Sequence, residues 1–148
     1  MTLVFATSIT TGAVGSLIFD PRKAWDFALW YAAIQAITSY FCSGVVKLFS
    51  ADWRSGRALT YFLDGGLYGP LRPNSTFRRF PVARLCSWAF ILWECAFPFV
   101  LLARDLAILW CCIAAVFHLL VFIFFSLNRF FWAWVAMFPA IIYCSGRL

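Results

Sequence analysis

The chain has 148 residues, of which 64% are hydrophobic and only 12% are charged, and its formal net charge is +6. Soluble domains contain roughly 45–50% apolar and about 25% charged residues. A globule of this length buries only about 70% of its chain surface, so a water-soluble fold would leave much apolar surface wet. The composition therefore argues against a soluble monomer, a disordered chain and a secreted disulfide scaffold, and it predicts an integral membrane protein.

Apolar residues gather in five continuous runs. These runs cover residues 3–19, 25–49, 85–103, 106–127 and 130–144. Continuous runs near the ~20 residues that cross a bilayer are typical of membrane helices, because a helix satisfies its own backbone polar groups in lipid. We therefore expect one all-α domain over residues 1–148, a multi-pass transmembrane helical bundle of about five membrane helices plus a short interfacial helix.

The long polar stretch between the second and third runs covers residues 50–84. Its first part predicts a helix at the membrane interface, with Asp52 as the N-cap and Gly65-Gly66 at the end. With five crossings, seven Lys and Arg residues fall on the side of this stretch and four on the other. That imbalance predicts a cytoplasmic loop, since Lys and Arg concentrate on the inner side of membranes.

Ionisable residues are rare inside the apolar runs. Glu94 lies in the middle of the third run, His118 lies near the middle of the fourth, and Lys47 lies near the end of the second. An ionised group at mid-helix costs roughly 2.5–3.5 kcal/mol to insert, so we expect these groups to face the bundle interior and to have partners. Two interpretations stay open, a structural hydrogen-bonded set or a catalytic cluster. Candidate substrate-binding residues at the neighbouring run ends are Asp52, Trp53, Asn128 and Arg129.

The second run carries a polar row at every fourth position, formed by Gln35, Ser39, Ser43 and Lys47. Residues four apart share a helix face, so the row predicts a polar stripe turned toward an internal cavity that ends at Lys47. The alternative is a packing helix whose lysine reaches the interface. A neighbouring row of small residues predicts close approach of another helix. This row contains Ala28, Ala32 and Ala36, with Gly44 further on.

Aromatic residues make up 21% of the chain, and several surround His118. Phe117, Phe122, Phe124 and Phe125 would line a slot for a flat hydrophobic ligand such as a quinone, although packing against lipid is the commoner use of such residues. The six cysteines have no spacing suited to zinc, so no metal site is expected. The basic residues lie between apolar runs, so nucleic acid is not an expected partner.

The sequence around Lys47 resembles a known family. The block YFCSGVVKL at residues 40–48, followed by ADW at residues 51–53 and then Gly56, resembles the signature of the vitamin K-dependent gamma-carboxylase membrane domain. Bacterial relatives of that domain are called HTTM (horizontally transferred transmembrane) proteins. Glu94, four residues before Pro98, resembles the Glu-x-x-x-Pro helix of this family, and His118 resembles its later intramembrane histidine. The resemblance covers about residues 25–143.

This resemblance implies a membrane enzyme. In the carboxylase, oxygenation of a reduced quinone produces a strong base, which removes a proton from a peptide glutamate, and the carbanion captures carbon dioxide. The family's catalytic lysine corresponds to Lys47, which would act as an amine base. Glu94 and His118 would orient the ligand or relay protons. A quinone or a peptide glutamate would be the substrate.

A second hypothesis is a non-catalytic membrane subunit or scaffold for peptide maturation or export. The carboxylase has earlier helices that supply another functional histidine, whereas residues 1–24 contain none. It also has a large soluble domain after its helices, and this sequence ends at residue 148. In this hypothesis the basic loop over residues 54–84 would contact an acidic partner protein or anionic lipid.

Overall fold

The computed structural model describes residues 2–18 and 20–147, and within them the chain is all-α, as predicted. The end of the first predicted run, Phe19, lies outside the described residues. The α-helices are α1 (Thr2–Gly15), α2 (Pro21–Phe49), α3 (Ala51–Ser55), α4 (Arg57–Asp64), α5 (Phe80–Cys95), α6 (Arg104–Phe125), α7 (Asn128–Val135) and α8 (Phe138–Cys144). Two 3₁₀ helices, η1 (Thr76–Arg78) and η2 (Phe97–Leu101), interrupt them.

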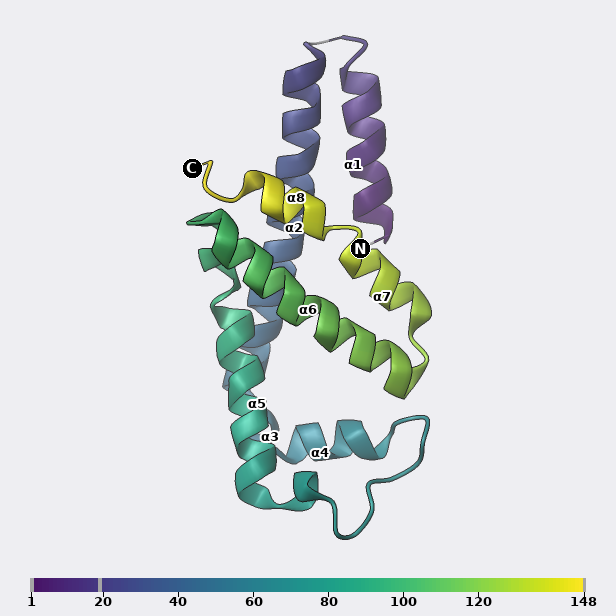
Figure 1. Cartoon of the computed structure of the whole chain (residues 1–148), viewed down its shortest axis with the longest axis vertical. Coiled ribbons are helices and arrows are strands. Elements are labelled where there is room, and N and C mark those ends of the chain that lie inside the picture. Colours follow the sequence, from purple (N-terminus) through teal and green to yellow (C-terminus); the bar gives the residue numbers. More distant parts are fainter. Residues whose placement is uncertain (1, 19, 148) are drawn as a thin grey trace.

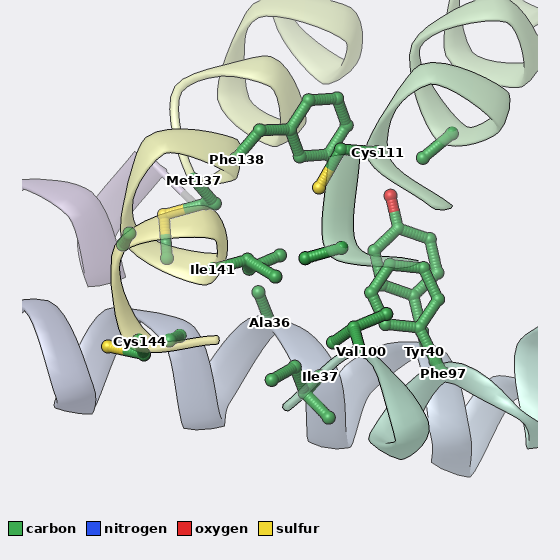
Figure 2. Packing of buried hydrophobic residues seen from close by; sticks show 14 of the residues in the cluster. Ala36, Ile37, Tyr40, Phe97, Val100, Cys111, Met137, Phe138, Ile141 and Cys144 are labelled. Carbon is green, nitrogen blue, oxygen red and sulfur yellow. The ribbon is translucent and has the colours of Figure 1, made fainter. Parts of the chain in front are cut away.

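Helix α2 is the central element, and α1, α5 and α8 pack along it (Figure 1). Its start is fixed by Asp20, whose carboxylate accepts a hydrogen bond of 2.8 Å from the Arg22 N–H, and by Pro21 in the first turn. The predicted alanine row is buried, which lets neighbouring helices approach its backbone closely. Figure 2 shows Ala36 of α2 facing Ile141 of α8 in the hydrophobic core.

The third predicted run forms two elements instead of one helix. Helix α5 ends at Cys95, and Pro98 lies in η2. A proline has no N–H to bond the carbonyl four residues earlier, and its ring collides with that carbonyl, so a regular α-helix cannot pass Glu94 and Pro98. Helix α6 then runs obliquely across α2 and α5 (Figure 1).

The fifth predicted run is also divided, into α7 and α8, with a turn at Ala136 and Met137. The prediction of one helix over residues 130–144 was therefore wrong. Pro139 stands in the first turn of α8, where its missing N–H breaks no helical bond. That proline is the sequence signal for the break.

The helix predicted at the start of the polar stretch is divided into two short helices, α3 and α4, that lie across the ends of α2 and α5 (Figure 1). The N-cap is Ser50, not the predicted Asp52, and its side chain accepts from the Trp53 N–H. Gly56 separates α3 from α4 with a φ of +83°, and a Cβ there would lie 2.6 Å from the backbone nitrogen of Arg84. The chain can therefore turn here, against α5, only with glycine. Helix α4 ends at Asp64, just before the predicted Gly65.

Among the described residues, two helices, α2 and α6, are long and apolar enough to cross a membrane. In their most apolar windows only 33% and 28% of the residues are buried within the chain, so most of this apolar surface faces outward. The 14 residues of α1 and the 16 of α5 fall short of a full crossing. The structure therefore fits association with a membrane, while the five predicted crossings stay a prediction.

Candidate functional site

A buried ion pair joins α2 to α5. Lys47 Nζ lies 2.6 Å from Glu94 Oε2 and 2.8 Å from Oε1, and it lies 2.6 Å from Ser43 Oγ. The two charged side chains are only 16% and 5% exposed. An ammonium has three hydrogens to donate, so each hydrogen of Lys47 has an acceptor in this arrangement. The partner expected for the buried carboxylate of Glu94 is therefore Lys47.

Gly44 lets these two helices come close enough for the pair to form. A Cβ at this position would lie 2.7 Å from the backbone nitrogen of Cys95 and 2.9 Å from Glu94 Cβ. Those distances are too short for any side chain, so α5 packs directly on the α2 backbone here. The small residue predicted for close helix packing thus stands beside the carboxylate that meets Lys47.

Of the two predicted substrate-binding residues in α3, Trp53 reaches the ion pair and Asp52 does not. The ring centre of Trp53 lies 5.2 Å from Lys47 Nζ, within the range of a cation–π contact. Its backbone carbonyl accepts a hydrogen bond from the hydroxyl of Ser87 in α5, which holds α3 against that helix. Asp52 instead forms an exposed ion pair with Arg57, and the side chains are 60% and 63% exposed.

A second buried polar pair links α2 to α6. The Tyr40 hydroxyl lies 2.6 Å from His118 Nε2, and both residues are almost fully buried. Trp134 of α7 stacks on the imidazole at 5.1 Å between ring centres and an interplanar angle of 13°. Phe97 stacks on the Tyr40 ring at 3.9 Å (Figure 2). This packing holds the phenol and the imidazole in one orientation.

The sequence analysis missed Tyr40 as a candidate site residue. Its position supplies a signal, because it stands three residues before Ser43 and seven before Lys47, on the same helix face. Gln35, by contrast, is exposed, although it was predicted to belong to the polar stripe. The stripe therefore reaches the protein interior only from Ser39 onward.

Two cavities meet at the Lys47–Glu94 pair. The larger, of about 610 Å³, lies among α3, α4, α5 and α6, and its walls are almost entirely apolar. The smaller, of about 270 Å³, is lined by Lys47, Glu94 and His118, together with Ser39, Tyr40 and Ser43. The three residues predicted as catalytic therefore line one cavity, and two of them also line the other.

The aromatic slot predicted around His118 is partly present. Phe117 lines both cavities and lies 5.2 Å from the imidazole, centre to centre. Phe124 and Phe125 line only the larger cavity, and Phe122 stacks on Phe131 instead.

Three predicted substrate-binding residues line neither cavity. Asn128 and Arg129 are exposed at the start of α7, and Asp52 is exposed on α3. Each lies near the end of an apolar run, as predicted, but this position does not place its side chain in the wall of either cavity.

Within the described residues, no three His, Cys, Asp or Glu side chains come together as a metal site, and the cysteines are free. Comparison of the chain with protein-family models, with curated proteins and with solved structures gives no match in any of the three. Any function assigned to the chain therefore depends on the chemistry of the two cavities and of the ion pair between them.

Proposed function

We propose that the chain is an integral, multi-pass membrane protein of the carboxylase-like HTTM type, which binds a reduced quinone in its larger cavity. The observation that carries this proposal is an apolar cavity of about 610 Å³ whose two charged lining residues are the buried pair Lys47 and Glu94. Its volume lies within the ~300–1,000 Å³ of typical ligand sites.

The ion pair favours a ligand with a hydroxyl head. Lys47 donates hydrogen bonds and Glu94 accepts them, and a hydroxyl is a group that can do both at once. A fatty-acid carboxylate would meet the negative charge of Glu94, and the carbonyl of an oxidised quinone can only accept. A quinol has two ring hydroxyls and a prenyl tail. A hydroxyl matches the Lys47–Glu94 end of the cavity, and the tail matches its apolar wall.

Proton removal from that hydroxyl is the chemistry that the pair can perform. This step would correspond to the activation of reduced vitamin K that the resemblance implies, in a carboxylase-like reaction with a peptide glutamate as the second substrate. The carbanion and carbon dioxide steps of such a reaction are implied by the resemblance alone.

Equilibrium binding of decyl-ubiquinol to the full chain in lipid nanodiscs tests the proposal. Ala89 lines the larger cavity, so Ala89→Trp should fill it and weaken binding by ~10-fold or more, equivalent to ~1.4 kcal/mol. Asp52→Ala, on the exposed ion pair, is the matched control and should leave affinity unchanged. Equal affinity in the wild type and in Ala89→Trp would remove this cavity as the binding site.

A non-catalytic membrane subunit is the second candidate, and the basic loop favours it. Arg54, Arg79 and Arg84 are exposed and make no ion pair with the described residues. They are therefore available to an acidic partner or to anionic lipid. Two results together would favour this candidate over the enzyme. A stoichiometric partner would co-purify with the chain, and the Ala89→Trp variant would remain fully functional in the same cells.

A further inference from the structure

We infer that Glu94 is the proton acceptor of this site and that Lys47 is a fixed cation that stabilises the anion left behind. The inference rests on the proposed function, since it concerns a hydroxyl bound at the same ion pair. It differs from the expectation that Lys47 is the base, and the difference comes from the hydrogen bonds of the two groups.

Lys47 has no lone pair to offer. Its three hydrogens point to Glu94 Oε1, Glu94 Oε2 and Ser43 Oγ, at 2.8, 2.6 and 2.6 Å. With Cε, these hydrogens fill all four positions around the nitrogen. Before Lys47 could accept a proton, it would have to give one away and break at least one of these bonds.

Glu94 has the free acceptor capacity that Lys47 lacks. A carboxylate offers about four lone-pair sites on its two oxygens. Oε1 accepts from Lys47 and, at 3.3 Å, from Ser43, while Oε2 accepts from Lys47 alone. Oε2 therefore retains a site for a further donor, and the carboxylate borders both cavities.

His118 is not placed to compete for this proton. Its Nε2 is engaged by the Tyr40 hydroxyl at 2.6 Å, and its Nδ1 is fully buried without a hydrogen-bond partner among the described residues. The imidazole thus has no accessible nitrogen to turn toward a ligand. Tyr40 in turn has its hydroxyl committed to the imidazole.

The step balances in atoms and in charge. The O–H bond of the ligand breaks, its electron pair stays on the ligand oxygen, and a new O–H bond forms on Glu94. Glu94 is then a neutral carboxylic acid and no longer holds the ammonium of Lys47 by charge. The ammonium donates its hydrogen bonds to the new oxyanion instead. The site carries one positive and one negative charge before and after the step, so no uncompensated charge is created in a water-poor cavity.

Infrared difference spectroscopy can follow this proton directly, because Glu94 is the only glutamate in the chain. The probe is 4-nonyl-2-nitrophenol, whose visible absorption distinguishes phenol from phenolate. The full chain, labelled with [δ-¹³C]glutamate, is placed in nanodiscs and compared with and without the probe. We expect a bound phenolate together with a protonated-carboxyl band that shifts with the ¹³C label. Phenolate without that band would overturn the inference.

Lys47→Arg provides a second, independent test, because arginine keeps the positive charge but cannot serve as a base. We expect Lys47→Arg to retain both the phenolate and the carboxyl band, with a phenolate yield within ~3-fold of the wild type. Lys23→Arg, at the exposed start of α2, is the matched control.

A Lys47→Arg protein that binds the probe but loses ~100-fold or more of the phenolate would identify Lys47 as the base, since general bases contribute ~10²–10⁴-fold. A wild-type chain that shows no saturable binding would overturn the proposed function and the inference with it. Binding without proton transfer to Glu94 would overturn the inference alone.

Discussion

Among the described residues, two ion pairs have the same shortest N···O distance, 2.6 Å, and opposite surroundings. Lys47–Glu94 has side-chain exposures of 16% and 5%, whereas Arg57–Asp52 has exposures of 63% and 60%. Water screens the second pair and competes for its hydrogen bonds, but it is largely excluded from the first. The two pairs therefore differ in burial and not in distance. Burial is what gives the Lys47–Glu94 pair chemical consequences that the exposed pair lacks.

The largest expected effect comes from leaving one charge of the buried pair without its partner. Glu94→Leu should destabilise the protein by roughly 3–5 kcal/mol, because it leaves the buried side chain of Lys47 without its partner. Unfolding in mild detergent, followed by the loss of helical circular dichroism, measures this. The double variant Lys47→Met/Glu94→Leu is the control and should recover most of the loss. A single variant as stable as the wild type would show that the pair is hydrated.

The next effect concerns the close contact that allows the buried pair to form. Gly44→Ala places a Cβ 2.7 Å from the Cys95 nitrogen, so α2 and α5 must separate. We expect a loss toward the upper end of the ~1–3 kcal/mol typical of overpacking, together with weaker quinol binding.

Gly65→Ala is the matched control for Gly44→Ala. Gly65 has an ordinary φ of −82°, and a Cβ there would have no neighbour nearer than 3.6 Å. Equal stability of the two alanine variants would mean that the helices can separate at little cost.

The sequence predicted the all-α fold from composition. It also predicted from the helical period that a polar stripe on the second run faces the interior, which holds from Ser39 onward but not for Gln35. Lys47, Glu94 and His118 stood out because titratable groups in apolar runs need partners. Gly44 stood out because small residues at helical spacing allow close packing. These inferences depend on local patterns, which a sequence displays directly.

Other features depend on contacts that no local pattern contains. Tyr40 shares a helix face with Ser43 and Lys47, but its partner His118 lies 78 residues later, so the helical period alone does not identify the pair. Asp52 looked like an N-cap because its residue type suits one, but the N-cap is Ser50, two residues earlier. The break before α8 was available from Pro139, whereas the turn at Gly56 is set by the approach of α5.

A smaller effect is expected at the second buried pair. Tyr40→Phe removes the hydroxyl that bonds His118 Nε2, and the loss should fall at the lower end of the ~1–3 kcal/mol for an unpaired buried group. The adjoining cavity of about 270 Å³ has room for a water that can replace the phenol, which limits the loss. Imidazole ¹⁵N NMR, with the single histidine as its only reporter, should show a changed Nε2 environment.

Tyr61→Phe is the control for that change, since Tyr61 is 74% exposed. It should alter neither the stability nor the histidine spectrum. An unchanged histidine spectrum in Tyr40→Phe would contradict the tyrosine–histidine pair itself.

The smallest effect is expected at the exposed pair, and it tests a prediction made from the sequence. Asp52→Ala should change stability by only ~0–1 kcal/mol, and the change should shrink further as salt screens Arg57. Quinol affinity should not change, because Asp52 is exposed and lines neither cavity. A double-mutant cycle with Arg57→Ala, measured at low and high salt, gives the coupling energy. If Asp52→Ala instead abolished binding while leaving stability intact, the substrate-binding role predicted for Asp52 would be restored, and the comparison between the buried and the exposed pair would lose its functional meaning.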